Sequence, residues 1–136
     1  SFTREEVIAE LVELLVRAGK IDDRESVLDA LYERERKGST GIGDGVAIPH
    51  ARHPETDGAL LAVGIAPDGI EFEAVDDELV YIVFLLLGSP EQPSLTIEAL
   101  ADIGSIVQIP DVHRRLIAAK DEQEVIEIIA EAQEHE

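Results

Sequence analysis

The chain has 136 residues, no cysteine, an aromatic fraction of 4% and a formal net charge of −19. This length predicts one compact domain over residues 1–136, and the lack of cysteine excludes disulfides, thiolate metal sites and thiol catalysis. The charge disfavours nucleic acid as a partner and indicates a solvated acidic surface of the kind found in high-salt cytoplasm, with an ordinary acidic protein as the alternative.

The N-terminal part of the chain predicts two helices. Thr3 and Glu6 form a capping-box pattern, and apolar residues follow at helical spacing. Asp22 and Glu25 repeat this pattern before a second helix, which continues through Arg36 and has a basic end that suits the helix dipole.

The middle of the chain predicts a buried sheet. Residues 46–48 form a short apolar run, residues 60–66 and 79–87 form longer ones, and residues 71–73 could add a shorter alternating strand. The longest run is about half the length that a membrane-spanning helix needs, so no membrane insertion is expected. Since the first residues also lack the pattern of a signal peptide, we expect a cytoplasmic location.

Three further helices are predicted over residues 95–107, 111–119 and 121–133, with residues 134–136 as a solvated tail. Helices therefore precede, separate and follow the predicted strands. This order favours an α/β fold, a single-domain sandwich in which a mixed β-sheet is flanked by helices on both sides.

The segment over residues 39–52 carries the chemistry. Its alternating glycines, which include Gly43 and Gly45, allow the backbone conformations that turn several N–H groups toward one anion. The segment has neither the Lys-Ser/Thr pair of a Walker loop nor the spacing of a dinucleotide fingerprint. Glycines alone more often mark a structural turn, so their spacing is a weak indication of phosphate binding.

His50 strengthens the phosphate interpretation. A neutral imidazole has a free ring nitrogen that can attack phosphorus at physiological pH. Pro49 restricts the backbone before it, and Arg52 offers a planar fork of donors that suits phosphoryl oxygens. The alternative is that His50 is a hydrogen-bonded histidine at the end of a strand.

Residues 41–52 resemble, almost residue for residue, the active-site motif of the enzyme IIA domains of the fructose/mannitol type, which belong to the bacterial phosphoenolpyruvate-dependent sugar phosphotransferase system (PTS). Residues 83–86 and 100–101 support the resemblance. It implies that His50 accepts a phosphoryl group from the phosphocarrier HPr and passes it to an enzyme IIB component during sugar uptake, most simply of fructose, with no cofactor or metal. Arg52, Gly43 and Gly45 would hold the phosphoryl group.

One position departs from the family pattern. Family members usually carry a second active-site histidine in a His-Leu-x-x-Leu-Ala pattern, and Thr96 stands at that position here. A threonine hydroxyl can donate a hydrogen bond to a phosphoryl oxygen but cannot supply a cationic ring. We therefore expect Thr96 to help hold the phosphoryl group, in a slower or regulatory member of the family.

Three alternatives stay open from the sequence. A nitrogen-regulatory type of IIA protein would use the same histidine but signal through protein binding, and a non-catalytic interaction domain would transfer nothing. A metal site could use His50 and His53 with carboxylates such as Glu55 and Asp57. His53 is otherwise expected to be a solvated loop residue, and His113 and His135 are expected on the surface.

Overall fold

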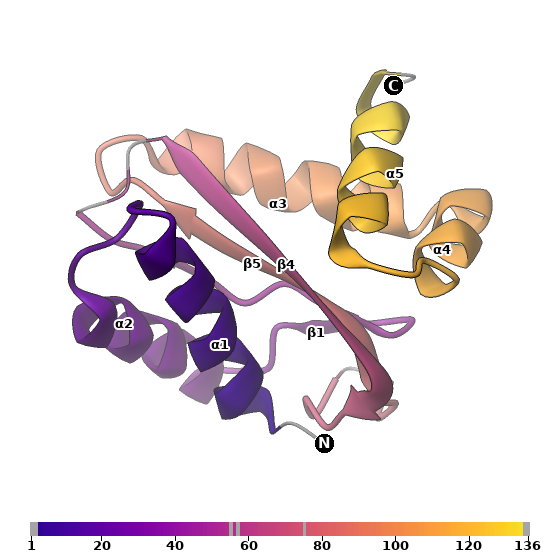
Figure 1. Cartoon of the computed structure of the whole chain (residues 1–136), viewed down its shortest axis with the longest axis horizontal. Helices are drawn as coiled ribbons and strands as arrows, with labels where there is room; N and C mark the ends of the chain where they lie inside the picture. The colour runs from indigo at the N-terminus through magenta and orange to yellow at the C-terminus, as the bar shows by residue number, and fades with distance from the viewer. Residues whose placement is uncertain (1–2, 55, 57, 75, 135–136) are drawn as a thin grey trace.

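The computed structural model describes residues 3–54, 56, 58–74 and 76–134. Among the described residues, two helices precede the strands, the five strands follow one another along the chain, and three helices come last, so the expectation that helices also separate the strands is wrong (Figure 1). The elements are, in order, α1 (Arg4–Arg17), α2 (Arg24–Arg36), β1 (Gly41–Gly43), β2 (Val46–Ala47), β3 (His50–Arg52), β4 (Ala59–Ile70), β5 (Val80–Gly88), α3 (Pro93–Val107), α4 (Pro110–Ile117) and α5 (Glu122–Glu134).

Strand β5 organises the sheet. It pairs antiparallel with β4 along one edge and parallel with both β2 and β3 along the other. The two short strands follow one another along the same edge, because Ala47 lies opposite Val83 and His50 lies opposite Leu86. Strand β1 adds an antiparallel hairpin to β2. The sheet is therefore mixed, and it places His50 beside a central strand.

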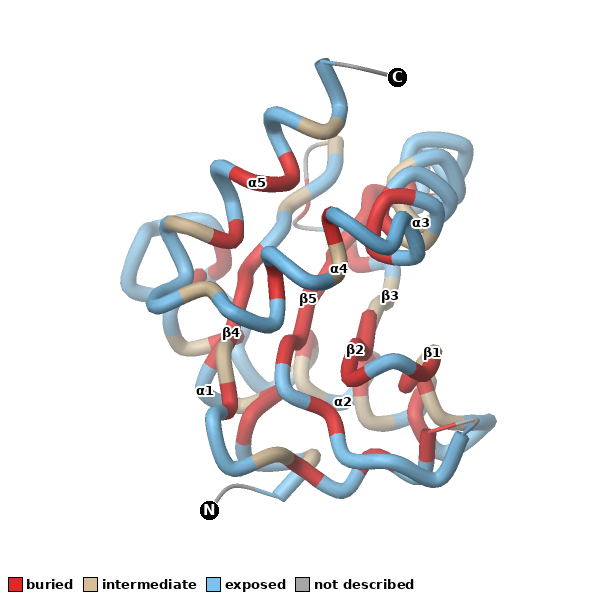
Figure 2. Tube along the Cα trace, turned by 90° about the vertical axis from the view of Figure 1, so that its right-hand side faces the viewer, coloured by how far each residue is buried: buried red, intermediate tan, exposed pale blue. Residues whose placement is uncertain are grey.

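The two faces of the sheet bury separate apolar clusters. Helices α1 and α2 pack against the face that carries Val83, Leu85 and Leu87. Helices α3, α4 and α5 pack against the face that carries Ile82 and Phe84. Figure 1 shows the two groups of helices on opposite sides of β4 and β5, and Figure 2 shows buried residues along β5 and the inner faces of the helices. The predicted sandwich is confirmed.

The helix boundaries follow local capping. The predicted capping box of α1 is confirmed, since Glu6 N donates to the Thr3 hydroxyl at 3.2 Å and Thr3 N donates to the Glu6 carboxylate at 3.1 Å. The predicted Asp22–Glu25 box is wrong. Helix α2 is instead capped by Asp23, whose carboxylate accepts from Ser26 N at 3.1 Å.

Two expectations about the ends of elements need correction. Residues 71–73 form no strand, because Glu73 takes a positive φ of 53° and its N–H donates to the side chain of Glu71 at 2.7 Å, which turns the backbone locally. The predicted tail is also shorter than expected, since Glu134 belongs to α5, and residues 135–136, His135 included, lie outside the described residues.

None of the helices in the described part of the chain combines the length and the apolar character that crossing a bilayer requires.

Candidate active site

A pocket of about 520 Å³ opens between α2, β3 and α3. Its walls come from three parts of the chain that are far apart in sequence. They are Ala30, Glu33, Arg34 and Lys37 from α2 and its C-cap, His50, Ala51 and Arg52 from β3, and Thr96, Ile97 and Leu100 from α3. The fold thus brings together His50, Arg52 and Thr96, which the sequence analysis proposed as site residues.

The sheet fixes the backbone around His50. The break between β2 and β3 falls at Ile48 and Pro49. The backbone stays hydrogen-bonded to β5 at this break, because Leu86 N donates to the Pro49 carbonyl at 2.9 Å. Ile48 N donates to the Thr40 carbonyl at 3.0 Å, which ties this break to the glycine-rich segment. The Ile48 carbonyl is left to accept from the His50 ring.

The hydrogen bonds of His50 define which ring nitrogen carries the proton. Nδ1 lies 2.8 Å from the Ile48 carbonyl oxygen, which can only accept, so Nδ1 must donate. Arg34 Nε lies 3.3 Å from Nε2, and a guanidinium can only donate, so Nε2 must accept. The neutral ring therefore presents the lone pair of Nε2, which is the nucleophilic electron pair that phosphoryl transfer requires.

The surroundings also keep this ring neutral. Burial of the half-buried side chain lowers the pKa of His50 below 6.5, although the hydrogen bond to the Ile48 carbonyl raises it. The positive charges of Arg34 and Arg52 lower this pKa further, while Glu35 opposes them. The lowered pKa favours the neutral, nucleophilic form of the imidazole ring.

Arg34 is a site residue that the sequence did not reveal. Its Nη1 donates to the Gly38 carbonyl at 2.7 Å while its Nε donates to His50, so the guanidinium is held at both sides. The available signal was the basic end of the second predicted helix, but helical spacing cannot show that this end faces a strand residue sixteen positions later.

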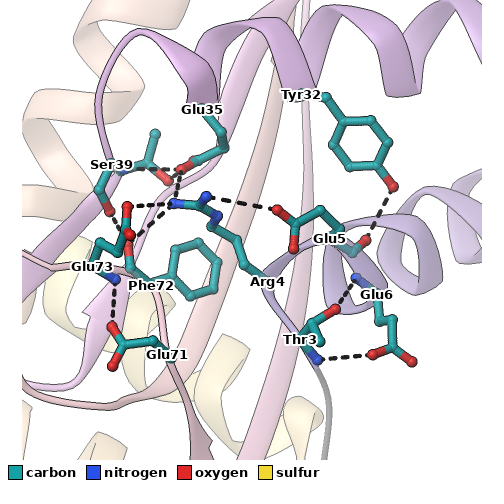
Figure 3. Close-up of polar contacts among 11 residues, drawn as sticks. Thr3, Arg4, Glu5, Glu6, Tyr32, Glu35, Ser39, Glu71, Phe72 and Glu73 are labelled. Carbon is teal, nitrogen blue, oxygen red and sulfur yellow. Dashed lines mark hydrogen bonds and ion pairs between the residues drawn. The ribbon is translucent and has the colours of Figure 1, made fainter.

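A buried ion pair anchors this end of α2. Glu35 is 6% exposed, accepts hydrogen bonds from the backbone N and the hydroxyl of Thr40, and lies 3.7 Å from Arg4 of α1. Figure 3 shows Arg4 reaching both Glu35 and Glu73. Because Arg34 precedes Glu35 directly, this cluster fixes the helix end that carries Arg34.

Arg52 and Thr96 present different surfaces to the pocket. Arg52 is exposed at the end of β3 and lines the pocket. Thr96 is 3% exposed, and its hydroxyl is buried with no hydrogen-bond partner among the described residues. That hydroxyl packs so close to Gly88 that a Cβ at Gly88 would overlap it. A bond from Thr96 to a phosphoryl oxygen would need a rotation of the side chain.

Gly43 and Gly45 belong to the β1–β2 hairpin and are not among the residues that line the pocket. Asp44 and Gly45 have φ values of 57° and 80°. A two-residue hairpin turn of type I′ requires positive φ at both of its central residues. The turn accounts for the glycine at position 45. The geometry gives neither glycine a contact with the pocket, in contrast to the expected role in holding the phosphoryl group.

Of the other histidines, His53 differs from expectation, and His113 lies partly exposed on a helix as expected. His53 was predicted to be a solvated loop residue, which is wrong, because it is 6% exposed and its Nε2 lies 2.7 Å from the Ser26 hydroxyl. His113 lies on α4 and its Nε2 is 2.6 Å from the Asp44 carbonyl.

The alternative of a metal site used Glu55 and Asp57, which lie outside the described residues. Within the described ranges, no group of three or more potential ligand side chains gathers as a metal site would need.

Comparisons with known proteins agree with this architecture. The family described as "Phosphoenolpyruvate-dependent sugar phosphotransferase system, EIIA 2" matches residues 2–132. A fructose-specific EIIA component of the PTS from Haloferax volcanii is 34% identical over 97% of this chain and 86% of its own length. The nitrogen regulatory protein of Klebsiella oxytoca is 38% identical over 78% of this chain and 66% of its own length.

Solved structures show the same fold. The nitrogen regulatory protein IIA-Ntr from Neisseria meningitidis superposes with a TM-score of 0.86 at 28% identity, over 95% of this chain and 88% of that one. The IIA mannitol domain of Escherichia coli superposes with a TM-score of 0.74 at 22% identity, over 95% of this chain and 90% of that one.

Proposed function

The chain belongs to the EIIA 2 family of the phosphoenolpyruvate-dependent sugar phosphotransferase system, and we propose that it is a phosphocarrier that takes a phosphoryl group from phospho-HPr onto His50 and passes it to an enzyme IIB component. One observation carries the proposal. Nε2 of His50, a ring nitrogen with a free electron pair, lies in the same open pocket as cationic side chains. These are the parts that phosphoryl transfer needs.

The first half of the reaction follows from the hydrogen bonds of His50. Nε2 attacks the phosphorus of the donor, the new N–P bond forms, and the bond between phosphorus and the donor nitrogen breaks with its electron pair returning to the donor. Arg34 must release Nε2 for this attack, and its N–H groups are then placed to bind phosphoryl oxygens. Nδ1–H keeps its bond to the Ile48 carbonyl throughout, which holds the ring in orientation.

The second half is the same displacement in reverse. A nucleophile of the IIB component attacks phosphorus, the N–P bond breaks, and the electron pair returns to Nε2, where Arg34 can donate to it again. Arg34 and Arg52 both line the pocket, and both offset the negative charge of the phosphoryl group. In this proposal the exchange uses no cofactor or metal and takes place in the cytoplasm.

Fructose is the sugar that we propose for the pathway. Two relatives support it, the Haloferax volcanii component described above and the fructose-specific EIIABC component of Bacillus subtilis, which is 33% identical over 93% of this chain. This chain spans 20% of the Bacillus subtilis protein. The structure of a complex between IIA and phosphorylated IIB of the mannitol system, similar to this fold with a TM-score of 0.76, supports a IIB partner.

A regulatory role is the second candidate, and the TM-score of 0.86 with the IIA-Ntr protein favours it. In that case the phosphorylated and unphosphorylated forms would differ in binding to other proteins. Transfer to a IIB acceptor separates the two roles. When purified fructose-type IIB is added to the phosphorylated protein, a carrier should pass its phosphoryl label to IIB. A regulatory protein should keep the label.

The experiment uses the parent protein, His50→Ala and His113→Gln as a matched histidine control away from the pocket. Each is incubated with phosphoenolpyruvate, enzyme I and HPr, and then with IIB. The proposal predicts labelling and onward transfer for the parent and the His113 variant but not for His50→Ala. A parent that is never labelled would identify the non-catalytic interaction domain.

A further inference from the structure

The basic side chains of this acidic protein are unevenly paired. The chain has 11 Lys and Arg against 30 Asp and Glu. Five of the basic side chains form ion pairs with carboxylates, and they are Arg4, Arg17, Arg24, Arg114 and Arg115. Six form none within the described part of the chain, and three of those six, Arg34, Lys37 and Arg52, line the pocket that contains His50. Despite the excess of carboxylates, these three pocket cations form no ion pair among the described residues, which leaves their charges available to an anionic ligand.

Lys37 is the pocket cation without an assigned role. It is the C-cap of α2 and keeps helical dihedral angles, with φ of −77° and ψ of −16°. Its N–H donates to the Arg34 carbonyl at 3.2 Å. Residues three apart on a helix share a face, so Lys37 and Arg34 line the same pocket, whereas Glu35 and Arg36 line a different one beside α1.

The opposite wall supplies no positive charge. Helix α3 contributes Thr96, Ile97 and Leu100, all of which are neutral. The charge that can meet a phosphoryl group therefore comes from α2 and β3. Glu33 is the one carboxylate among the lining residues, one turn before Lys37, and it forms no ion pair with Lys37 within the described residues. A cation beside Glu33 also offsets the repulsion that this carboxylate exerts on an incoming phosphoryl group.

We propose that Lys37 contacts the phosphoryl group on His50 and is a third cationic residue of the transfer site, an inference that rests on the proposed phosphocarrier function. An ammonium on a flexible stem is suited to follow phosphoryl oxygens as the group arrives and leaves. The charge of a transferring phosphoryl group is spread over its three equatorial oxygens, so cations from both α2 and β3 can stabilise the transition state together.

The alternative is that Lys37 serves only the dipole of α2, since cations near a helix C-terminus are stabilising. Arg36 tests this directly. It is the preceding residue, is also exposed and near the same helix end, and changes the net charge by the same amount when neutralised, but it faces away from the His50 pocket. If Lys37 acts only through the helix dipole or through long-range attraction of the phosphoryl donor, Arg36→Gln and Lys37→Gln should change the transfer rate equally.

The experiment measures the rate of phosphoryl transfer from phospho-HPr by rapid quench for the parent, Lys37→Gln, Lys37→Arg and Arg36→Gln. We expect Lys37→Gln to be slower by roughly tenfold, a small effect for an oxyanion contact because Lys37 is exposed. Lys37→Arg should keep most of the rate, and Arg36→Gln should stay within about twofold of the parent. Equal rates for Lys37→Gln and Arg36→Gln would overturn the inference.

A second readout separates this inference from the proposed function. Inorganic phosphate is titrated into each protein, and its affinity is measured from the NMR signals of the His50 ring. Lys37→Gln should bind phosphate more weakly than Arg36→Gln. If the parent is never labelled by phospho-HPr, the proposed carrier function is wrong. The phosphate affinities alone then decide whether Lys37 binds a phosphate group in this pocket. Equal affinities in that case would reject a role for Lys37 in binding phosphate.

Discussion

Replacement of Thr96 by valine separates the structural role of this residue from a chemical one. The Thr96 hydroxyl is buried against Gly88 and has no hydrogen-bond partner among the described residues. A buried hydroxyl without a partner costs about 1–3 kcal/mol, and valine has the same branched shape and a similar helix propensity. We therefore expect Thr96→Val to stabilise the fold by about 1 kcal/mol, which raises the midpoint of thermal unfolding by roughly 4 °C in a domain of this size.

The same geometry predicts the kinetic result. Since the hydroxyl lies against β5, Thr96→Val should transfer phosphate within about twofold of the parent rate, contrary to the expectation drawn from the sequence. Unfolding is followed by circular dichroism and transfer by rapid quench. Thr96→Ser is the matched control, because it keeps the hydroxyl, loses the methyl group and should destabilise the fold. A valine variant that is less stable, or that transfers tenfold more slowly, would show that the hydroxyl is bonded or reaches the phosphoryl group.

Three other predictions follow from contacts around the pocket and from the charge. Gly88→Ala should destabilise the fold by about 1–3 kcal/mol, because the added Cβ would lie 2.9 Å from the Thr96 Cβ and overlap the Thr96 hydroxyl. In urea denaturation, the double variant with Thr96→Ala should recover part of this lost stability. If the costs of the two substitutions simply add, the contact is refuted. An NMR titration should find the pKa of His50 below 6.5, and Arg34→Gln should raise it because a positive charge and a burial contact are lost; an unchanged midpoint in this variant would show that Arg34 does not act on the ring. The midpoint of thermal unfolding should rise from low salt to molar potassium chloride, because salt screens the repulsion within a chain of net charge −19, and a flat or falling midpoint would contradict adaptation to high salt.

The layers of this fold could be predicted from the sequence because each depends on local patterns. The capping box of Thr3 and Glu6 and the continuous apolar runs of β4 and β5 each mark an element without knowledge of its neighbours. Errors appeared where two local choices compete. Asp22 and Asp23 both suit an N-cap, and the structure uses Asp23.

The pocket could be predicted only in part, because it is assembled from segments that are distant in sequence. The motif around His50 predicted His50 and Arg52 as site residues, and both line the pocket. Arg34 and Lys37 became visible once α2 was packed beside β3, since hydrogen bonds and shared pocket walls are tertiary facts. His53 was misjudged for the same reason, because the side chain that hydrogen-bonds to it, Ser26, lies on α2, far from it in sequence.

Identification of the phosphorylated atom tests the central claim most directly. The parent protein, labelled with ¹⁵N in its histidines, is phosphorylated with phosphoenolpyruvate, enzyme I and HPr, and the N–P bond is located by ¹⁵N and ³¹P NMR. Because Nδ1 donates to the Ile48 carbonyl and Nε2 holds the free electron pair, we predict acid-labile phosphate on Nε2 of His50 and none on His50→Ala. Phosphate on Nδ1, on His53, or on the His50→Ala protein would contradict the account.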